Sequence, residues 1–391
     1  GVSVIMYQRG EKILEESYGY ASLELGVPMP ELAIFEIGSV TKQFTAVAIL
    51  KLEEAGMLSL DDDITSYIEF DNKGRPVTLQ QLLNHTSGIV SYTDIPEFWD
   101  MSLHNYSRDS MISLVERHGF LFEPGEMMSY NNSAYFLLGL IIESVSGMSY
   151  SEYLQKEIFL PLGMGQTSYC SNSEVLDGKV YGYDETDDGL VQKSYIDHTW
   201  PYAGGSLCSS AEDLLTWLKA LHSGQVFSGD SYEKFITPLR LNDGVPMRYA
   251  CGIIHYKDHG NEVIEHSGGI HGFSSATRYY PEEDLYVVCL KNSTGPKYIA
   301  ETLVEPLIWQ VIEKHDRPRI PLEPDLIGLS HAYQGLIRGQ TTTVEIAVRP
   351  EGLMMKFEGQ ATPDTLKDYI GNRTWANGNH LITIRDKEVT M

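Results

Sequence analysis

The sequence predicts an α/β protein of the α+β kind, in which helices flank an antiparallel β-sheet and an all-helical insert interrupts that sheet. Strand-like patterns occur at the start, in residues 2–7 and 13–20, and return from about residue 247. Between them, residues 60–240 carry mainly the apolar spacing of three and four residues that is typical of helices. A sheet built from both ends of this region, with helices packed on it, covers its apolar faces in the simplest way.

Length and composition limit the kind of protein this can be. A chain of 391 residues, 42% hydrophobic and 21% charged, is expected to form two or three globular domains. Its formal net charge of −25 repels phosphate backbones and anionic lipids, so nucleic acids and membrane surfaces are poor partners. The apolar run at residues 135–142 is too short for a membrane span, which needs about 20 residues. The chain opens on a strand-like run without an initiator Met, so we expect its N-terminus to be trimmed, and the sequence does not reveal where the protein is targeted.

Residues 39–55 are predicted to form the first long helix, because apolar side chains recur at helical spacing and Gly56 can end it. Ser39 stands at its start, and Lys42 lies one turn later on the same face. The serine can simply cap the helix. It can also be a nucleophile, since a helix N-terminus favours developing negative charge and a partly buried lysine, whose pKa falls, can accept its proton.

The S-x-x-K spacing is common, and a second copy in this chain illustrates that. Ser231 and Lys234 have the same spacing, but the surrounding residues SGDSYEKF are polar, so a capped surface helix is expected there. The first copy differs because a long apolar helix follows it. On this pattern alone, a nucleophile and a capping serine remain equally good interpretations of Ser39.

Two further motifs supply polar groups that a Ser-Lys pair could use. Tyr130-Asn131-Asn132 precedes a predicted helix, and there a phenol could relay a proton while an amide orients the lysine and the substrate. His266-Ser267-Gly268-Gly269 ends a predicted strand, where glycines let a ligand approach the backbone and a free N–H can bind an oxyanion. Each motif also has a structural interpretation, the first as a helix cap and the second as a turn between strands.

In this order, S-x-x-K, Y-x-N and H-x-G resemble the motifs of the serine β-lactamase and penicillin-binding protein family, in its class C-like branch. The resemblance extends over residues 1–315 and implies a fold similar to that of class C β-lactamases. Further segments that look like the family are LLNHTSGI at 82–89, PGEMMSYNNSAYFLLGLIIESVSG at 124–147, PLGM at 161–164, AGGSLCSSAEDLLTWL at 203–218 and EHSGGIHGFSS at 265–275.

The resemblance implies catalysis through an acyl-enzyme, with neither a metal nor a cofactor. By position, Ser39 resembles the family's nucleophile, Lys42 its activator and Tyr130 its proton shuttle. Asn132 resembles the residue that orients the lysine and the substrate amide. The N–H groups of Ser39 and Gly269 resemble the oxyanion hole. The implied substrate is a small molecule or a short peptide, and the implied location is the bacterial periplasm, the cell envelope or the medium.

One departure from the family pattern bears on the substrate. Penicillin-recognising members usually carry K-T-G where this chain has His266, Ser267 and Gly268. A histidine is expected to be only partly charged near neutral pH, so it should support an anionic substrate less well than lysine. The pattern is similar to D-aminopeptidases, amidases and esterases of the family. We therefore expect cleavage of amide, peptide or ester bonds with weak or no β-lactamase activity; the alternative is a slow or inactive peptide-binding sensor on the same scaffold.

Several cysteine and histidine residues have structural interpretations. Cys170, Cys208, Cys251 and Cys289 lie far apart and are expected to be buried free thiols. His255 and His259 flank a strand-to-turn segment rather than a helix, so a zinc site is not expected. His85 is expected to be a buried hydrogen-bonding residue.

The last part of the chain is predicted to form a separate small domain. A helix over residues 297–314 should kink or break at Pro306, and it closes a main domain of residues 1–315. Residues 316–325 have the composition of a linker, and residues 326–391 are predicted to form a small antiparallel β domain. Whether that domain is complete, what it does and how many subunits assemble stay open.

Overall fold

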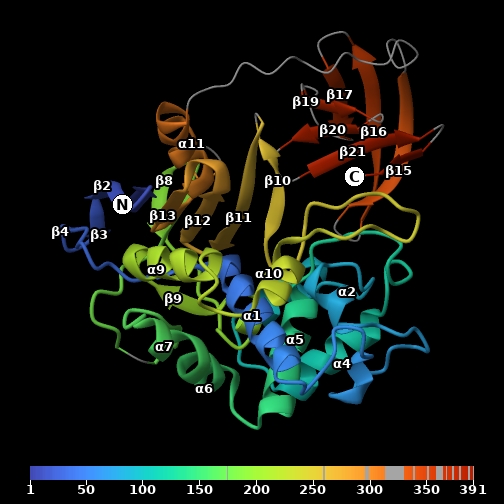
Figure 1. The fold of residues 1–391 in the computed structure, drawn as a ribbon, viewed down its shortest axis with the longest axis horizontal. Coiled ribbons are helices and arrows are strands. Elements are labelled where there is room, and N and C mark those ends of the chain that lie inside the picture. The colour runs from blue at the N-terminus through green and yellow to red at the C-terminus, as the bar shows by residue number, and fades with distance from the viewer. Residues whose placement is uncertain are drawn as a thin grey trace. The chain divides into compact units, whose positions relative to one another are not determined.

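A computed structural model describes residues 1–173, 175–258, 260–295 and 299–312, and in the C-terminal part the strands between residues 330 and 390 (Figure 1). The chain divides into two compact units, residues 1–255 with 261–313 and residues 256–260 with 314–391. The linker expected at residues 316–325 lies outside the described residues, so the domain boundaries stay a prediction.

A six-stranded sheet has the order β10-β11-β12-β13-β1-β2, and apart from the end of β10 it belongs to the first unit, where it lies above the helices (Figure 1). The N-terminal strand β1 pairs antiparallel with β13, which lies almost 300 residues later in the chain, from Val2 opposite Lys291 to Gln8 opposite Leu285. The sheet is therefore built from both ends of the region, and the predicted fold class is confirmed. Its strands are β1 (Val2–Gln8), β2 (Glu11–Tyr18), β10 (Ile254–Asp258), β11 (Asn261–Ile270), β12 (Phe273–Tyr280) and β13 (Leu285–Lys291).

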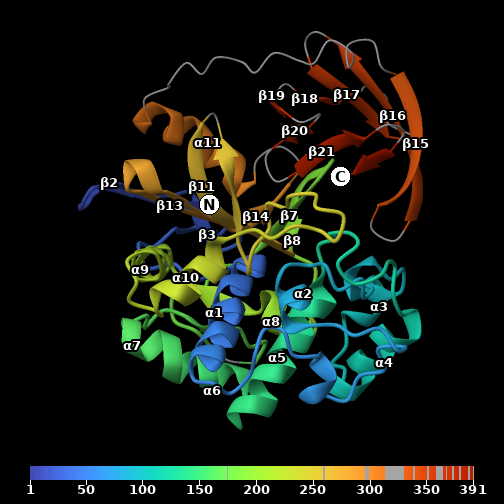
Figure 2. The same ribbon diagram turned by 45° about the vertical axis from the view of Figure 1, so that its right-hand side comes forward.

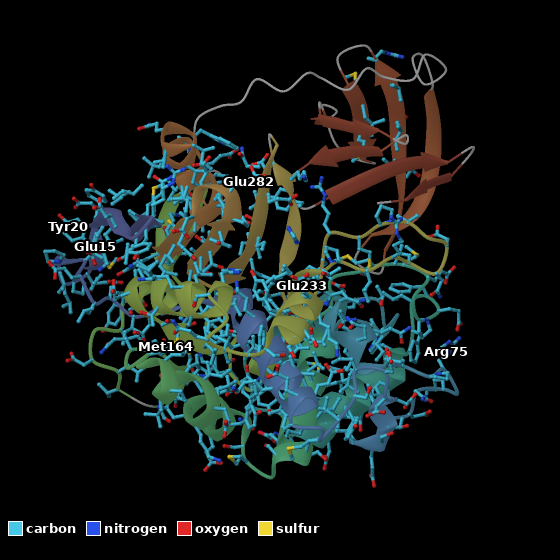
Figure 3. All side chains as sticks on the ribbon, viewed as in Figure 1. Glu15, Tyr20, Arg75, Met164, Glu233 and Glu282 are labelled. Carbon is cyan, nitrogen blue, oxygen red and sulfur yellow. A yellow bond between two sulfur atoms is a disulfide. The ribbon has the colours of Figure 1, made fainter. Side chains whose placement is uncertain are left out.

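The helix α1 (Thr41–Glu54) is buried on nearly all sides, as expected for a helix that is apolar around most of its circumference. Figures 1 and 2 both show it below the sheet and beside α5 (Asn132–Ser146). Its Phe44 stacks on Trp217 of α9 (Ala211–His222), with ring centroids 4.1 Å apart. Figure 3 shows how densely side chains fill the space around these helices. This core fixes the N-terminal end of α1, where the motif residues begin.

The insert is mostly helical, as predicted, and short strands cross it. One small sheet joins β5 (Phe35–Glu36), β9 (Leu207–Ser209) and β6 (Ser168–Tyr169), and so connects the segment before α1 to the end of the insert. The remaining helices are α2 (Leu79–Leu83), α3 (Phe98–Met101), α4 (Arg108–His118), α6 (Tyr150–Leu154), α7 (Leu160–Leu162), α8 (Tyr202–Gly205) and α10 (Gly229–Ile236). The remaining strands are β3 (Tyr20–Ser22), β4 (Val27–Pro28), β7 (Tyr183–Thr186), β8 (Gly189–Gln192) and β14 (Ser293–Thr294).

The cysteine prediction is wrong for two of the four residues. Cys170 and Cys208 form a disulfide with Cα atoms 5.2 Å apart. Cys208 lies on β9, and Cys170 directly follows the neighbouring strand β6. The Cys170 N–H donates to the Ser206 carbonyl and so extends the pairing of β6 with β9 by one residue. A separation of 38 residues gives no hint of this pairing in the sequence. Cys251 and Cys289 are buried free thiols, as expected.

The last helix and the second unit agree in outline with the sequence analysis. Helix α11 (Ala300–Val311) continues through Pro306, so no break occurs there. The second unit contains two four-stranded antiparallel sheets, which confirms a β-rich C-terminal part. Their strands are β15 (Ser330–Ile337), β16 (Gln340–Arg349), β17 (Gly352–Phe357), β18 (Asp364–Leu366), β19 (Asp368–Gly371), β20 (Thr374–Asn377), β21 (His380–Arg385) and β22 (Glu388–Thr390). Within the described part of the chain, no helix has the length and apolar character needed to cross a bilayer.

Candidate active site

A short 3-10 turn presents Ser39 at the entrance to α1. The turn η1 (Gly38–Val40) follows β5, and Gly38 has φ +51°, which glycine adopts without strain. A Cβ on Gly38 would lie 2.9 Å from the carbonyl oxygen of Gly269, so η1 and β11 meet backbone to backbone. Ser39 is partly exposed, and the N-cap position of α1 belongs to Val40 without a side-chain hydrogen bond. The interpretation of Ser39 as a helix cap is therefore wrong.

Lys42 brings together residues that come from separate motifs. Its side chain is completely buried, and its Nζ lies 3.2 Å from Ser39 Oγ. The same nitrogen lies 2.8 Å from Asn132 Oδ1 and 2.7 Å from the carbonyl oxygen of Gly204. The ring of Tyr130 is 4.7 Å from it. One buried nitrogen thus contacts the hydroxyl, the amide and the phenol-bearing side chain that the motifs predicted.

The partners of Lys42 suit an uncharged amine. Burial lowers the pKa of Lys42 well below its usual range. The oxygens of Asn132 and Gly204 can only accept hydrogen bonds, whereas the Ser39 hydroxyl can donate or accept. An ammonium group with three N–H donors would also fit these partners, but burial favours the neutral amine, whose two N–H groups serve the carbonyl and amide oxygens and whose lone pair is left for Ser39. In that state the lone pair of Lys42 faces the hydroxyl proton of Ser39.

The loop that carries Tyr130 and Asn132 is fixed by His85. The N–H of Asn131 donates to His85 Nδ1 at 3.1 Å, and the His85 ring lies 4.5 Å from the Tyr130 ring, centroid to centroid. Asn131 also caps α5 by accepting from the Ala134 N–H at 2.9 Å. The predicted hydrogen-bonding role of His85 is confirmed, since it is 1% exposed.

Tyr130 and Asn132 point their polar groups toward the Ser-Lys pair. The Tyr130 side chain is 38% exposed, yet desolvation around its hydroxyl raises its pKa, and a hydrogen bond with Ser39 opposes that effect only in part. The phenol therefore stays protonated near neutral pH. Asn132 accepts from Lys42 and donates from Nδ2 to Thr93 Oγ1 at 3.2 Å, so one of its two amide protons remains for a substrate.

The expectation that His266 is partly charged is wrong. Its side chain is 3% exposed, with Nε2 2.8 Å from the Tyr249 hydroxyl and Nδ1 2.6 Å from the Ser267 carbonyl oxygen. Burial, with the nearby Lys42, lowers the pKa of His266 to about 3. This burial could not be predicted, because the H-x-G motif alone does not show which residues pack on the histidine.

Gly268 and Gly269 bring β11 against the serine turn. A Cβ on Gly268 would lie 2.1 Å from the carbonyl oxygen of Ile37 and 3.0 Å from the backbone nitrogen of Ser39. A Cβ on Gly269 would meet nothing within 4 Å. A Cβ on Gly38 would likewise lie 3.0 Å from the backbone nitrogen of Gly269, so the backbone nitrogens of Ser39 and Gly269 both lie at the contact between η1 and β11.

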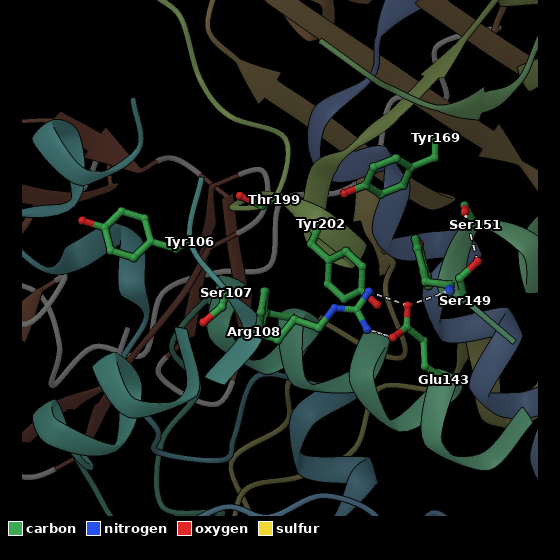
Figure 4. A pocket seen from close by; sticks show the side chains of 11 residues that line it. Tyr106, Ser107, Arg108, Glu143, Ser149, Ser151, Tyr169, Thr199 and Tyr202 are labelled. Carbon is green, nitrogen blue, oxygen red and sulfur yellow. Dashed lines mark hydrogen bonds and ion pairs between the residues drawn. The ribbon is translucent and has the colours of Figure 1, made fainter. Parts of the chain in front are cut away.

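The helix α8 supplies a site partner that the motifs did not predict. Its Gly204 carbonyl accepts from Lys42, and its Tyr202 has φ +37°, which is strained for a residue with a side chain. Tyr202 also lines a cavity of about 270 Å³ beside the ion pair of Arg108 and Glu143 (Figure 4). The motif residues do not line this cavity, which is separate from the candidate active site.

The other candidates have structural surroundings. Ser231 lies within α10, which Ser228 caps, and Lys234 pairs with Glu53 at 2.9 Å. His255 contacts Glu262 at 3.2 Å, while His259 lies outside the described residues. Two residues outside the three motifs contact the predicted site residues: Gly204 contacts Lys42, and Tyr249 contacts His266. The triplet AGG at residues 203–205 belongs to a segment that resembles the family, but nothing in the sequence indicates that the Gly204 carbonyl contacts Lys42.

Comparisons with known proteins agree with this geometry. The Beta-lactamase family model matches residues 1–303. Penicillin-binding protein 4* of Bacillus subtilis is 32% identical over 381 residues, covering 92% of this chain and 84% of that protein. The octameric penicillin-binding protein homologue from Pyrococcus abyssi is similar in structure, with a TM-score of 0.69, 26% identity, and coverage of 99% of this chain and 93% of that one. The D-amino acid amidase from Ochrobactrum anthropi SV3 has a TM-score of 0.66 and 25% identity, covering 75% and 86%.

The family model spans more than half of the chain, and the fold, with its sheet built from both ends, is the fold of the solved relatives. The chain therefore belongs to the family of serine β-lactamases and penicillin-binding proteins.

Proposed function

We propose that this protein is a serine hydrolase that cleaves amide, peptide or ester bonds through an acyl-enzyme on Ser39. The observation that carries the proposal is the 3.2 Å contact between Ser39 Oγ and the buried Nζ of Lys42. The lowered pKa of Lys42 leaves a lone pair for the hydroxyl proton, and two fixed acceptors aim that lone pair at Ser39.

In acylation, Lys42 takes the proton of Ser39 as Oγ attacks the substrate carbonyl carbon. The carbonyl oxygen becomes an oxyanion that the N–H groups of Ser39 and Gly269 bind, and each such donor typically contributes a factor of about 10² to 10³ in rate. Tyr130, which stays protonated, gives its proton to the leaving group and recovers one from Lys42. The leaving bond breaks, and the acyl group stays on Ser39.

In deacylation, water enters where the leaving group departed and attacks the ester carbonyl. The neutral Lys42, through Tyr130, accepts a proton from that water as its oxygen bonds to the carbonyl carbon, and the same relay delivers this proton to Ser39 Oγ as the bond from Oγ to the acyl carbon breaks. Asn132 keeps Lys42 in place throughout and offers its remaining amide proton to the substrate.

We propose that the substrates are those of D-aminopeptidase-type members, with weak or no β-lactamase activity. The neutral, enclosed His266 supports this choice, since it offers no cation to the carboxylate that β-lactams carry. The structural likeness to a D-amino acid amidase gives further support. A location in the periplasm, in the cell envelope or outside the cell is consistent with this proposed activity and stays a prediction.

An activity-based fluorophosphonate tests the nucleophile. We expect it to label the protein and to leave Ser39→Ala unlabelled, while Ser231→Ala, at the second S-x-x-K copy, is labelled like the unchanged protein. Label that persists on Ser39→Ala would rule out this nucleophile.

A substrate panel then separates a hydrolase from a slow sensor. It contains p-nitrophenyl esters, D- and L-amino-acid anilides and a chromogenic cephalosporin. Turnover of the esters or D-anilides supports the hydrolase. Stoichiometric labelling without turnover of any member would instead favour the peptide-binding sensor.

A further inference from the structure

His266 is held from both of its ring nitrogens. Nδ1 lies 2.6 Å from the carbonyl oxygen of Ser267, which can only accept, so Nδ1 carries the proton. Nε2 lies 2.8 Å from the hydroxyl of Tyr249. Both side chains are 3% exposed, and burial raises the pKa of Tyr249 well above its usual range, so its phenol keeps its proton and donates it to Nε2.

We propose that Tyr249 is a positioning residue that determines specificity, because it holds His266 as a neutral imidazole whose Nε2 has no proton to offer a substrate. This inference rests on the proposed function and deepens it. It gives a role to Tyr249, a residue outside the three motifs, and this role predicts which class of substrate the protein cleaves.

The surroundings of His266 favour the neutral form on each side. From α1, Lys42 is the charged group that acts on it, and any charge there opposes protonation of the imidazole. From the loop before α5 comes the Tyr130 phenol, with ring centroids 6.2 Å apart. The His85 ring, 4.4 Å from that of Tyr249, is itself kept neutral by burial. On β12 the residue opposite His266 is Thr277, whose hydroxyl donates to the His266 carbonyl at 3.0 Å.

The consequence concerns the leaving-group side of the substrate. Tyr130 is the proton donor to the leaving group, so that group must lie beside the Tyr130 ring and hence near His266. Held in this way, His266 offers a carboxylate on the leaving group neither a positive charge nor an N–H at Nε2. The favoured substrates therefore have uncharged leaving groups, such as amides, anilides and neutral esters.

Nitrogen NMR of the ¹⁵N-histidine-labelled protein tests the hydrogen-bonding state without any need for activity. The His266 signals are assigned by their loss in His266→Gln. We expect Nδ1 protonated and Nε2 unprotonated, without change, between about pH 5 and pH 8, across the range where a free histidine titrates near 6.5. A His266 ring in the unchanged protein that titrates near 6.5, or that carries its proton on Nε2, would overturn the proposal.

Kinetics test specificity with two esters, phenyl acetate and 3-carboxyphenyl acetate, which differ only by a carboxylate on the leaving group. The readout is the ratio of their kcat/KM values, so a general loss of activity cancels. In the unchanged protein we expect this ratio to stay within about twofold between pH 8 and pH 5.5. In Tyr249→Phe we expect the relative kcat/KM of the carboxylate ester to rise about tenfold over that range, the effect of one charge-assisted hydrogen bond.

The double variant Tyr249→Phe with His266→Gln shows whether the pH dependence of the kcat/KM ratio comes from His266. Its ratio should again be independent of pH, because glutamine cannot be protonated. A flat ratio in Tyr249→Phe alone would overturn the proposal, as would a pH-dependent ratio that survives in the double variant. If the unchanged protein hydrolyses neither ester, the proposed function fails, while the NMR experiment still decides the state of His266.

Discussion

Gly268→Ala is the sharpest test of how the candidate active site is assembled. The added methyl group would lie 2.1 Å from the Ile37 carbonyl oxygen and 2.4 Å from Ser275 Oγ. Ser275 donates to the same carbonyl at 2.7 Å, so β12 ties the Ile37 segment to the sheet. Since a Cβ approaches neighbouring atoms no closer than 3.0 Å, β11 and the Ser39 turn must separate by about 1 Å (3.0 − 2.1 = 0.9).

That separation moves the N–H of Gly269 away from the N–H of Ser39. A misplacement of about 1 Å typically costs about 10² in rate, and the loss of one oxyanion donor costs about 10² to 10³. We therefore expect kcat/KM for a small p-nitrophenyl ester to fall by a factor of about 10² to 10³. Overpacking should also lower the free energy of unfolding by about 1 to 3 kcal/mol, which thermal melts would register.

Gly165→Ala, outside the candidate active site, is the control, since its methyl group would meet no atom within 4 Å. With p-nitrophenyl acetate, the smallest of these esters, we expect its kcat/KM to stay within about threefold of the unchanged protein. Assays are run well below the melting temperature of each variant, so that both are folded. If Gly268→Ala is folded and as active as Gly165→Ala, the close approach of β11 to the serine turn does not build the site.

Three other changes probe the lysine, a buried carboxylate and the disulfide. Lys42→Met should lower kcat/KM by at least about a thousandfold. The folded protein keeps Lys42 deprotonated at a pH where the unfolded chain binds a proton, so the free energy of unfolding should rise with pH up to about 10.4. Thermal melts of Lys42→Met at several pH values should lack this contribution to the rise. Burial opposes ionisation of Glu36, but His198 and the ammonium groups of Lys193 and Lys179 lower its pKa to about 2. The stability that the ionised carboxylate contributes should therefore be lost as the pH falls from about 4.3 to 2. In Glu36→Gln the free energy of unfolding should depend less on pH over this range. Reducing the bond between Cys170 and Cys208, which closes a 38-residue separation, should cost about 4 kcal/mol in the free energy of unfolding, measured by denaturant titration with and without reductant.

Each of these has an outcome that contradicts it. An unchanged rate in Lys42→Met would show that the proton leaves Ser39 by another route. Acid unfolding of Glu36→Gln with the slope of the unchanged protein would mean that the carboxylate is not held ionised by its neighbours. A thiol titration that finds four thiols in the unreduced, denatured protein would show that the disulfide does not form.

The motif residues could be predicted because their signals are local. Ser39 and Lys42 are three residues apart on one helical turn, and Asn132 starts the helix whose apolar run is visible in the sequence. The fold class was predictable for a similar reason, since a change of apolar period from helical to strand-like needs no knowledge of tertiary contacts.

What escaped prediction depends on contacts between distant segments. Tyr249 belongs to no motif and becomes part of the site only through its bond to His266, and the neutral state of that histidine follows from burial that no spacing encodes. The pairing of Cys170 with Cys208 depends on β6 and β9, two strands of two and three residues, too short to show an alternating pattern. Asn131, to which the motif assigned no role, fixes the loop between His85 and α5.

The contact between Lys42 and α8 has a consequence for mutational scans of this protein. The acceptor at position 204 is a carbonyl oxygen, which every amino acid provides. A methyl group at Gly204 would approach its nearest neighbours, Tyr135 Cβ, Asn132 Oδ1 and Lys42 Nζ, at 3.5 to 3.6 Å, which is ordinary van der Waals contact. An alanine scan should therefore score position 204 as tolerant, although its peptide group is one of the three partners of the lysine. Backbone chemistry, such as replacing the amide by an ester that weakens this carbonyl as an acceptor, is needed to measure what α8 contributes.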